Sequence, residues 1–195
     1  MHPVYLFIGQ SGSGKDTQIA LLQQKLLSID PTMQSFYLKT GDKFRAFIEK
    51  QGFTSNRTSK MMAEGKLPPA FLAVHMWAQE LIEHYDGTTT VFIDGTPRVP
   101  AEVPLLLSAA EFYGWTIDVI NLQVSDEWAN DRLRGRGRTD DTTAQTWGRI
   151  QWFHESVQPA IDLLRESPLV RFHDIHGEQT VEQVHKDVCE ALGVA

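Results

Sequence analysis

Cysteine is almost absent from this sequence: Cys189 is the only one in 195 residues. A single cysteine excludes an intrachain disulfide framework and a multi-cysteine zinc site, and it is typical of a reducing compartment. Long apolar runs are missing too, because none approaches the roughly 18 residues that a membrane-spanning helix needs. The chain starts without a basic segment, so we expect no secretion signal. We therefore expect a cytoplasmic protein with no membrane partner.

Basic residues are in the minority, with 18 Lys and Arg against 25 Asp and Glu, which gives a net charge of −7. This sign argues against a protein that coats nucleic acid, so any anionic ligand must be bound by a local cluster of positive charge. The content of hydrophobic residues, 42%, is that of a folded globular protein. The length suits one domain, and we expect it to act as a monomer.

Apolar, strand-like runs alternate with helical patterns along the whole chain. The expected strands cover residues 4–8, 35–38, 90–93, 115–122 and 170–172. Helices are expected over residues 15–29, 102–112, 142–164 and 181–192, from about residue 126, and in pieces over 43–84 that break near Gly52 and Pro68. This alternation predicts a three-layer α/β fold with a central five-stranded parallel sheet. Such sheets bind ligands beyond the carboxyl ends of their strands.

The run GQSGSGK at residues 9–15 lies between the first expected strand and the first expected helix. In this position it matches most of a P-loop, in which backbone N–H groups and a lysine surround the phosphates of a nucleoside triphosphate. The alternative is a glycine-rich turn with an incidental lysine. Asp16 stands where many P-loops have a magnesium-binding hydroxyl, and Thr17 follows it. The expected ATP-binding residues here are Gly9, Gly12, Ser13, Gly14, Lys15, Asp16 and Thr17.

Two further segments predict a second anion site. Thr40 opens a helix that carries Arg45, although a capping threonine and a solvent-facing arginine would explain this pair equally well. The run DGTPR at residues 94–98 directly follows a buried strand. Asp94 can hold magnesium through water molecules, and Arg98 can bind a phosphate with two parallel hydrogen bonds.

Half of the ten arginines fall within eighteen residues, at positions 132, 134, 136, 138 and 149. Bringing two phosphate chains together requires fixed positive charge, which guanidinium groups supply. The alternatives are a solvated basic helix end or a nucleic-acid patch.

These blocks together resemble the adenylate kinase family of nucleoside monophosphate kinases. GQSGSGKDTQ at residues 9–18 resembles the family's P-loop, in which a glycine stands at the position of Asp16. TGDKFR at 40–45 resembles S-T-G-D-x-x-R, DGTPR resembles D-G-F-P-R, and DRLRGRGRTDD at 131–141 resembles the lid of the short-lid enzymes. The resemblance implies a P-loop kinase core with a monophosphate-binding insertion at about 40–69 and a very short lid at about 134–142.

The resemblance also assigns residue roles. The donor ATP would be bound additionally by Arg132, Arg136 and Gly177. The nucleoside monophosphate would be bound by Thr40, Arg45, Lys66, Leu67, Pro68, Gly95, Arg98, Glu102, Arg138 and Arg149. The catalytic residues would be Lys15, Asp94, Arg98, Arg132, Arg138 and Arg149. Magnesium would be held by Asp94 through water, with Asp16 as a second candidate.

The activity that follows is transfer of the γ-phosphoryl group of MgATP to AMP, which gives two ADP. Glu102 stands where the family has a base-reading glutamine, and an ionised glutamate can only accept hydrogen bonds. It would suit guanine, or it could point to solvent, so GMP, a pyrimidine monophosphate or a deoxynucleotide stay open as acceptors. A P-loop kinase for a small alcohol and a regulatory nucleotide-binding module without turnover are the remaining alternatives.

Overall fold

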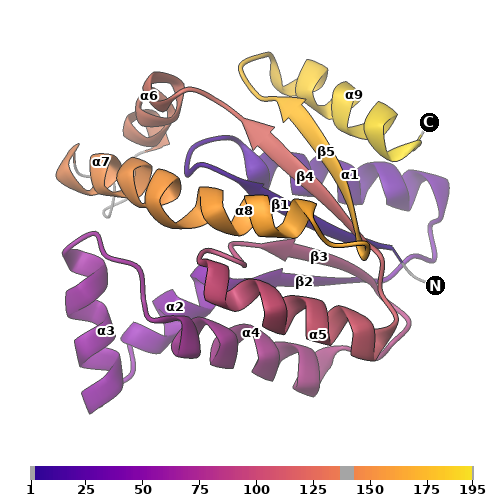
Figure 1. Cartoon of the computed structure of the whole chain (residues 1–195). Coiled ribbons are helices and arrows are strands. Elements are labelled where there is room, and N and C mark those ends of the chain that lie inside the picture. Colours follow the sequence, from indigo (N-terminus) through magenta and orange to yellow (C-terminus); the bar gives the residue numbers. More distant parts are fainter. Residues whose placement is uncertain (1–2, 137–142, 195) are drawn as a thin grey trace.

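The computed structural model describes residues 3–136 and 143–194, without the side chains of residues 136 and 143–145. Its centre is a parallel sheet of five strands in the order β2-β3-β1-β4-β5 (Figure 1). The strands are β1 (Val4–Gly9), β2 (Ser35–Lys39), β3 (Thr90–Asp94), β4 (Ile117–Gln123) and β5 (Val170–His176). The prediction of a five-stranded parallel sheet is confirmed.

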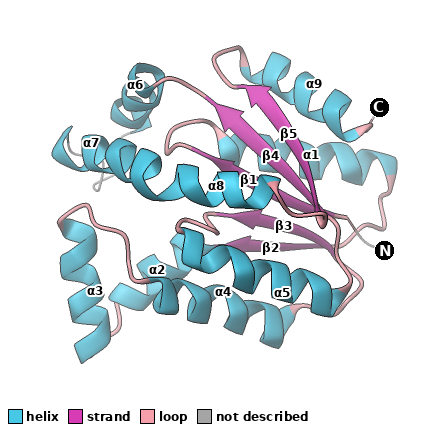
Figure 2. Cartoon of the chain, in the orientation of Figure 1, coloured by secondary structure: helices cyan, strands magenta, loops and turns pink. Residues whose placement is uncertain are grey.

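Helices cover both faces of this sheet (Figure 2). The first half of the chain contributes α1 (Lys15–Ile29), α2 (Thr40–Ile48), α3 (Phe53–Ala63) and α4 (Ala70–His84). The second half contributes the 3₁₀ turn η1 (Pro100–Glu102), α5 (Val103–Tyr113), α6 (Asp126–Arg136), α7 (Thr143–Trp152), the π-helical turn η2 (Phe153–Val157), α8 (Gln158–Arg165) and α9 (Val181–Leu192). The expected three-layer α/β architecture is therefore present.

Alternation of side chains along the strands produces two separate cores. In β1, Leu6 faces a core made with α4, α5 and α8, whereas Phe7 faces a core made with α1 and α9. Both residues are at most 1% exposed. Because successive residues of a strand point to opposite faces, a continuous apolar run such as VYLFI serves both layers at once. The P-loop that follows β1 is thus anchored on both sides of the sheet.

The helix expected over residues 142–164 is present as a continuous helical run, with a π-turn inside it. It divides into α7, the π-turn η2 and α8, with Pro159 in the first turn of α8. Proline has no N–H to donate to the preceding turn and crowds the carbonyl there, which favours an irregularity directly upstream. The α7 end of this run contributes Arg149 and Trp152 to the cavity beyond the carboxyl ends of the strands.

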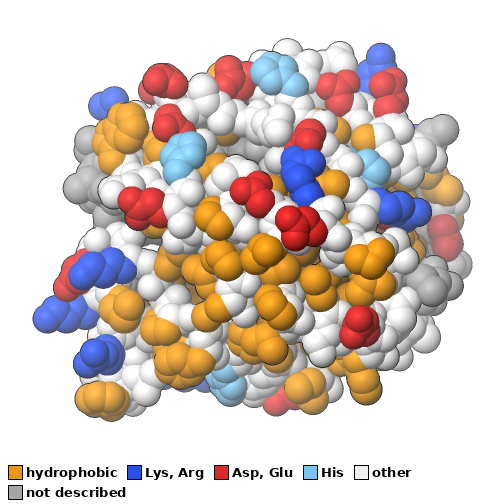
Figure 3. Space-filling view, in the orientation of Figure 1, with side chains coloured by type: hydrophobic (Ala, Val, Ile, Leu, Met, Phe, Trp, Pro, Cys, Tyr) orange, Lys and Arg blue, Asp and Glu red, His pale blue; other side chains and the backbone are white. Residues whose placement is uncertain are grey.

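The breaks expected in the segment 43–84 are confirmed, since α2, α3 and α4 are separated around Gly52 and before Ala70. Among the described residues, no helix is both long and apolar enough to cross a membrane. Figure 3 shows apolar side chains gathered over the face that α4, α5 and α8 form. The exposed members there include Leu105, Phe112 and Leu163.

Candidate functional site

A cavity of about 770 Å³ opens beyond the carboxyl ends of the strands. Its lining comes from the P-loop, the start of α1, the end of β2, α2, the DGTPR run and α7. In a parallel sheet these segments lie far apart in the chain but meet at one edge. The cavity therefore has the position expected for the ligand site.

The P-loop is packed so tightly that two of its positions accept only glycine. Gly9 has φ +137° and Gly12 has φ +91°, a region that L-residues rarely adopt. A Cβ on Gly9 would lie 2.5 Å from the Leu122 carbonyl oxygen, and one on Gly12 would lie 2.6 Å from that of Ala129. Close backbone packing against β4 and α6 therefore fixes the shape of the phosphate cradle.

The lysine of the loop is folded over its own backbone. Lys15 Nζ donates hydrogen bonds to the carbonyl oxygens of Gly9, at 2.9 Å, and of Gln10, at 2.8 Å. Both acceptors belong to the loop itself, so the ammonium group of Lys15 lies directly beside the phosphate cradle. A phosphate bound by the loop would meet this positive charge directly.

The side chain of Asp16, in the first turn of α1, is directed toward β2. Its Oδ1 lies 2.8 Å from Nζ of Lys39, the last residue of β2, and Tyr37 donates a longer hydrogen bond of 3.5 Å to the same oxygen. A positive partner thus offsets the carboxylate that would repel phosphate oxygens. Burial raises the pKa of the Tyr37 phenol, and the nearby carboxylates Asp94, Asp16 and Asp42 raise it further, so Tyr37 donates as a neutral hydroxyl.

Asp94 ends β3 and is 9% exposed. Its Oδ1 is buried and has no hydrogen-bond partner among the residues that the structure describes. Burial raises the pKa of Asp94, which Lys15 and Arg98 oppose. A lone carboxylate with an unused oxygen fits a hydrated Mg²⁺ that arrives with ATP phosphates, since Mg²⁺ keeps several waters and needs few protein ligands. The described residues hold no cluster of three or more metal-ligating side chains.

Two guanidinium groups of the cavity lining, those of Arg45 and Arg98, both lie close to Gly41. Gly41 lies between them, because a Cβ there would be 3.6 Å from Arg45 Nη1 and 3.8 Å from Arg98 Nη2. Arg98 Nε donates to the Gly95 carbonyl at 2.8 Å, and its Cζ lies 5.7 Å from the ring centre of Trp152. Burial lowers the pKa of Arg98, although Asp94 and Glu102 oppose this; arginine stays charged nonetheless.

Glu102 differs from the expected base-reading or solvent-facing residue. It is 1% exposed and does not line the cavity. Its Oε1 accepts from the backbone N–H of Arg98 at 3.3 Å, and its Oε2 accepts from Thr96 Oγ1 at 3.4 Å. Thr96 Oγ1 also lies 3.0 Å from Thr40 Oγ1. The carboxyl group therefore holds the DGTPR run through these two hydrogen bonds, because η1 places Glu102 next to that loop.

Most of the predicted site residues come together in this one cavity. Its lining includes Gly9, Gly12, Gly14, Lys15, Asp16, Thr17, Arg45, Lys66, Leu67, Pro68, Asp94, Gly95, Arg98, Arg132 and Arg149. Four predicted residues lie outside the lining: Ser13, Thr40, Glu102 and Gly177. Arg138 and the side chain of Arg136 fall outside the described part of the chain, as does most of the expected lid.

Lys39 and Trp152 are among the lining residues that sequence reasoning did not assign to the site. Lys39 could have been found because it ends a parallel strand, where ligand-binding residues gather. Trp152 had no such signal, since it reaches the cavity only through the path of α7. Arg132, by contrast, was predicted, and its Cζ lies 4.9 Å from the ring centre of Trp128.

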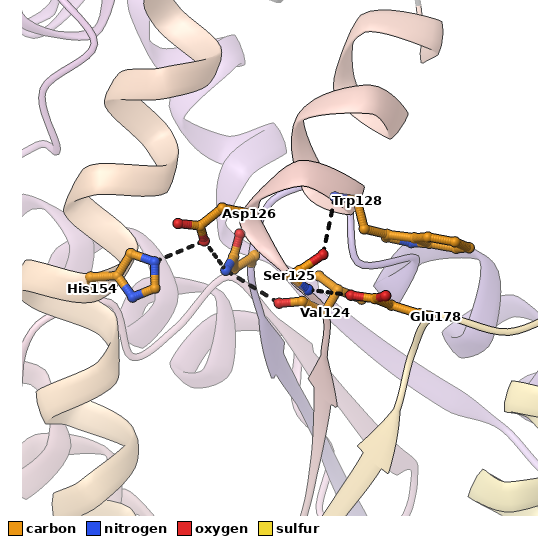
Figure 4. A network of polar contacts seen from close by, with 7 residues as sticks. Val124, Ser125, Asp126, Trp128, His154 and Glu178 are labelled. Atoms are coloured by element: carbon orange, nitrogen blue, oxygen red, sulfur yellow. Dashed lines mark hydrogen bonds and ion pairs between the residues drawn. The ribbon is translucent and has the colours of Figure 1, made fainter.

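A polar network ties the P-loop to two helices. Gln10 Nε2 donates to Asp126 Oδ1 at 2.8 Å, and His154 Nε2 lies 2.8 Å from the same oxygen. Figure 4 shows Asp126 on α6 and His154 on η2 facing each other, with Ser125 and Glu178 joined nearby. Burial raises the pKa of Asp126, but the hydrogen bonds from His154 and Gln10 outweigh it and lower the pKa. Asp126 thus links His154 of the π-turn with Gln10 of the P-loop.

The sequence model described as adenylate kinase matches residues 7–168, which include the P-loop, the DGTPR run and the arginine-rich segment. The chain belongs to the adenylate kinase family. It is 30% identical over 189 residues to an adenylate kinase of Corynebacterium glutamicum strain R, with 96% of this chain and 98% of that protein covered. An adenylate kinase of Prochlorococcus marinus is 28% identical, with coverage of 96% and 97%.

The structure shows the contacts of two residues that depart from the motifs of the adenylate kinase family. Asp16, at a position where the family's P-loop has glycine, forms an ion pair with Lys39. Glu102, at a position where the family has glutamine, is hydrogen-bonded inside the protein. Neither carboxylate therefore meets a bound nucleotide as an isolated negative charge.

Proposed function

We propose that this member of the adenylate kinase family transfers the γ-phosphoryl group of MgATP to AMP and so produces two ADP. One observation carries the proposal: a single cavity holds a P-loop with Lys15 on one side and the paired guanidinium groups of Arg45 and Arg98 on the other. An ATPase or a switch protein needs the first anion site but not the second. A kinase for a small alcohol would not need two arginines at its acceptor.

The chemistry requires positioning and charge more than proton transfer. A nucleoside monophosphate is largely dianionic at neutral pH, because the second pKa of its phosphate is about 6. It therefore needs no general base to act as a nucleophile. Arg98 and Arg45 would hold the acceptor phosphate, while Lys15, Arg132 and Arg149 would stabilise the charge on the transferring group. Arg138 joins this set by the family resemblance.

Magnesium would enter as part of the MgATP substrate. Asp94 is the residue suited to hold its water molecules, because its Oδ1 has unused hydrogen-bonding capacity in the described structure. The ion supplies positive charge to the phosphates when it is bound. Ser13 and Thr17 belong to the same proposed donor site, together with Gly177 and Arg136 by family resemblance.

The resemblance assigns two segments that would close over the bound nucleotides. Residues 40–69, which form α2, α3 and the segment with Lys66, Leu67 and Pro68, would close over the monophosphate. Residues 134–142 would form a very short lid. Closure of both would exclude water and so favour transfer over hydrolysis. We also propose that the protein acts as a cytoplasmic monomer; its single cysteine, Cys189, is a buried free thiol, which suits a reducing compartment.

The proposal is tested by a panel of acceptors. Purified protein, ATP and Mg²⁺ are mixed with AMP, GMP, CMP, UMP and the deoxy forms, and nucleoside diphosphate formation is measured. AMP should give the highest kcat/KM, and omission of Mg²⁺ should abolish turnover. Highest activity with another monophosphate would reassign the acceptor. Nucleotide binding without any diphosphate formation would instead support the regulatory alternative.

A further inference from the structure

Lys39 lies at the seam between the proposed donor and acceptor sites. It is the last residue of β2, it pairs in register with Asp94 of β3, and it directly precedes the segment that carries Arg45. Its Nζ lies 2.8 Å from Asp16 Oδ1, in the first turn of α1. A single ammonium group thus connects the P-loop helix with the strand that leads into the proposed acceptor site.

Stability alone does not account for this ion pair. The side chains of Lys39 and Asp16 are 23% and 44% exposed, and pairs of such exposure contribute about 0–1 kcal/mol. Asp16 is already favourably placed by the dipole of α1, since it lies in the first turn of that helix. Both side chains line the ligand cavity rather than the outer surface. Their position therefore points to a role toward the ligand.

The charge and donor inventory of Lys39 fits a phosphate. An ammonium group has three N–H donors, and one donor suffices for Asp16 Oδ1 at 2.8 Å. Asp42 Oδ2 is further away, at 3.9 Å. Asp16 fixes the direction of the long lysine side chain, which otherwise would lose rotamer entropy on binding. A phosphate oxygen entering the seam would then meet a cation that is already in place.

We propose that Lys39 is a further phosphate-binding residue, which contacts the nucleotide phosphates where donor and acceptor meet, and that Asp16 is a positioning residue acting through Lys39. The inference rests on the proposed kinase function and refines it. It differs from the alternative in which Asp16 acts on magnesium, because that role would not depend on Lys39.

The test is a double-mutant cycle with Lys39→Met, Asp16→Asn and the combined variant, assayed for kcat and for KM of ATP and AMP. Lys39→Met should lower kcat/KM roughly 10- to 100-fold, as expected for loss of one charged hydrogen bond. Lys39→Arg should restore most of this activity. Asp16→Asn should cost less, and it should cost nothing further once Lys39 is Met.

Lys43→Met is the matched control, because Lys43 forms an ion pair of 2.7 Å with Glu80 but does not line the cavity. Its kinetic constants should equal those of the wild type. Thermal unfolding of every variant identifies a loss that is due to misfolding. Unchanged kinetics of a folded Lys39→Met protein would overturn the inference, as would an equal effect of Asp16→Asn in both backgrounds.

A second readout separates this inference from the proposed function. Calorimetry measures the affinity for a diadenosine molecule whose two halves are joined by five phosphates, with no turnover involved. Lys39→Met should weaken this affinity, and it should also flatten the loss of affinity with added salt, because one phosphate contact is gone. If the wild type forms no ADP, the proposed function is wrong. If Lys39→Met binds the diadenosine molecule as tightly as the wild type does, only the proposed role of Lys39 is wrong.

Discussion

Glu102 accepts a hydrogen bond from the backbone N–H of Arg98 at 3.3 Å, so a buried carboxyl group supports the loop that carries an arginine of the cavity lining. The same group accepts from Thr96, which in turn contacts Thr40 at the start of α2. Burial raises the pKa of Glu102, and the hydrogen bond from Arg98 opposes this. Glu102, which the family resemblance places at the base, is thus hydrogen-bonded to the loop that carries Arg98 instead.

Glu102→Gln should leave the ranking of acceptor nucleotides unchanged, because the side chain does not line the cavity. Glu102→Ala should lower the free energy of unfolding by about 1–3 kcal/mol, since two buried partners lose their acceptor. The acceptor panel and urea unfolding measure the two effects. A marked shift toward AMP in Glu102→Gln would show that the side chain reaches the base during turnover.

Arg98→Ala should reduce kcat/KM for phosphoryl transfer by roughly 100- to 1,000-fold, the usual cost of removing one preorganised donor to a transition state. The fold should persist, because Arg98 belongs to a loop and not to either main core. Steady-state ADP formation and circular dichroism provide the measurements.

Arg57→Ala is the control for this arginine, since Arg57 is exposed on α3 and is not part of the cavity lining. It should behave as the wild type. Near-normal turnover of Arg98→Ala would remove Arg98 from the proposed acceptor site.

Gly12→Ala should disrupt the phosphate cradle, because its Cβ would lie 2.6 Å from the Ala129 carbonyl oxygen at a φ of +91°. Gly114→Ala has a positive φ too, +67°, but meets nothing within 4 Å. It should therefore show only the left-handed backbone cost of about 1–2 kcal/mol. The unfolding temperature and the affinity for ATP should fall more in Gly12→Ala than in Gly114→Ala. Equal behaviour of the two variants would contradict the tight contact with α6.

Asp94→Asn should lower the activity of the protein and raise its stability at neutral pH. Burial raises the folded pKa of Asp94 above its unfolded value, so the unfolded chain releases this proton first. The contribution of Asp94 to stability is therefore largest below the unfolded pKa of about 3.9 and falls as pH rises through the folded pKa. Asparagine does not titrate, so the stability of Asp94→Asn relative to the wild type should grow with rising pH.

Urea unfolding of both proteins between about pH 4 and pH 7 follows this difference. A difference that stays constant over the range would mean that Asp94 has the same pKa in the folded and unfolded states. Turnover of Asp94→Asn should be strongly reduced at every pH, because its side chain no longer supplies a charge to hydrated Mg²⁺.

Local sequence patterns were sufficient to predict the sheet, the P-loop and the two arginines, Arg45 and Arg98, that line the cavity. Apolar runs determined the strands, and glycines at positions 9 and 12 marked a turn that only they can form. Arg45 and Arg98 were found because both follow the ends of parallel strands. The long helix expected before β5 is present, but a helical pattern does not reveal the π-turn upstream of Pro159.

The direction in which side chains point was decided only by the tertiary structure. Asp16 and Lys39 are 23 positions apart, and their pairing depends on how α1 and β2 meet at the sheet edge. Glu102 faces inward because η1 places it beneath the DGTPR run. The sequence by itself indicated which chemical groups gather at this edge, because strand ends follow from local hydrophobic patterns and parallel strands end at the same edge of a sheet. Packing between distant segments determined which of those groups line the cavity and which contact each other.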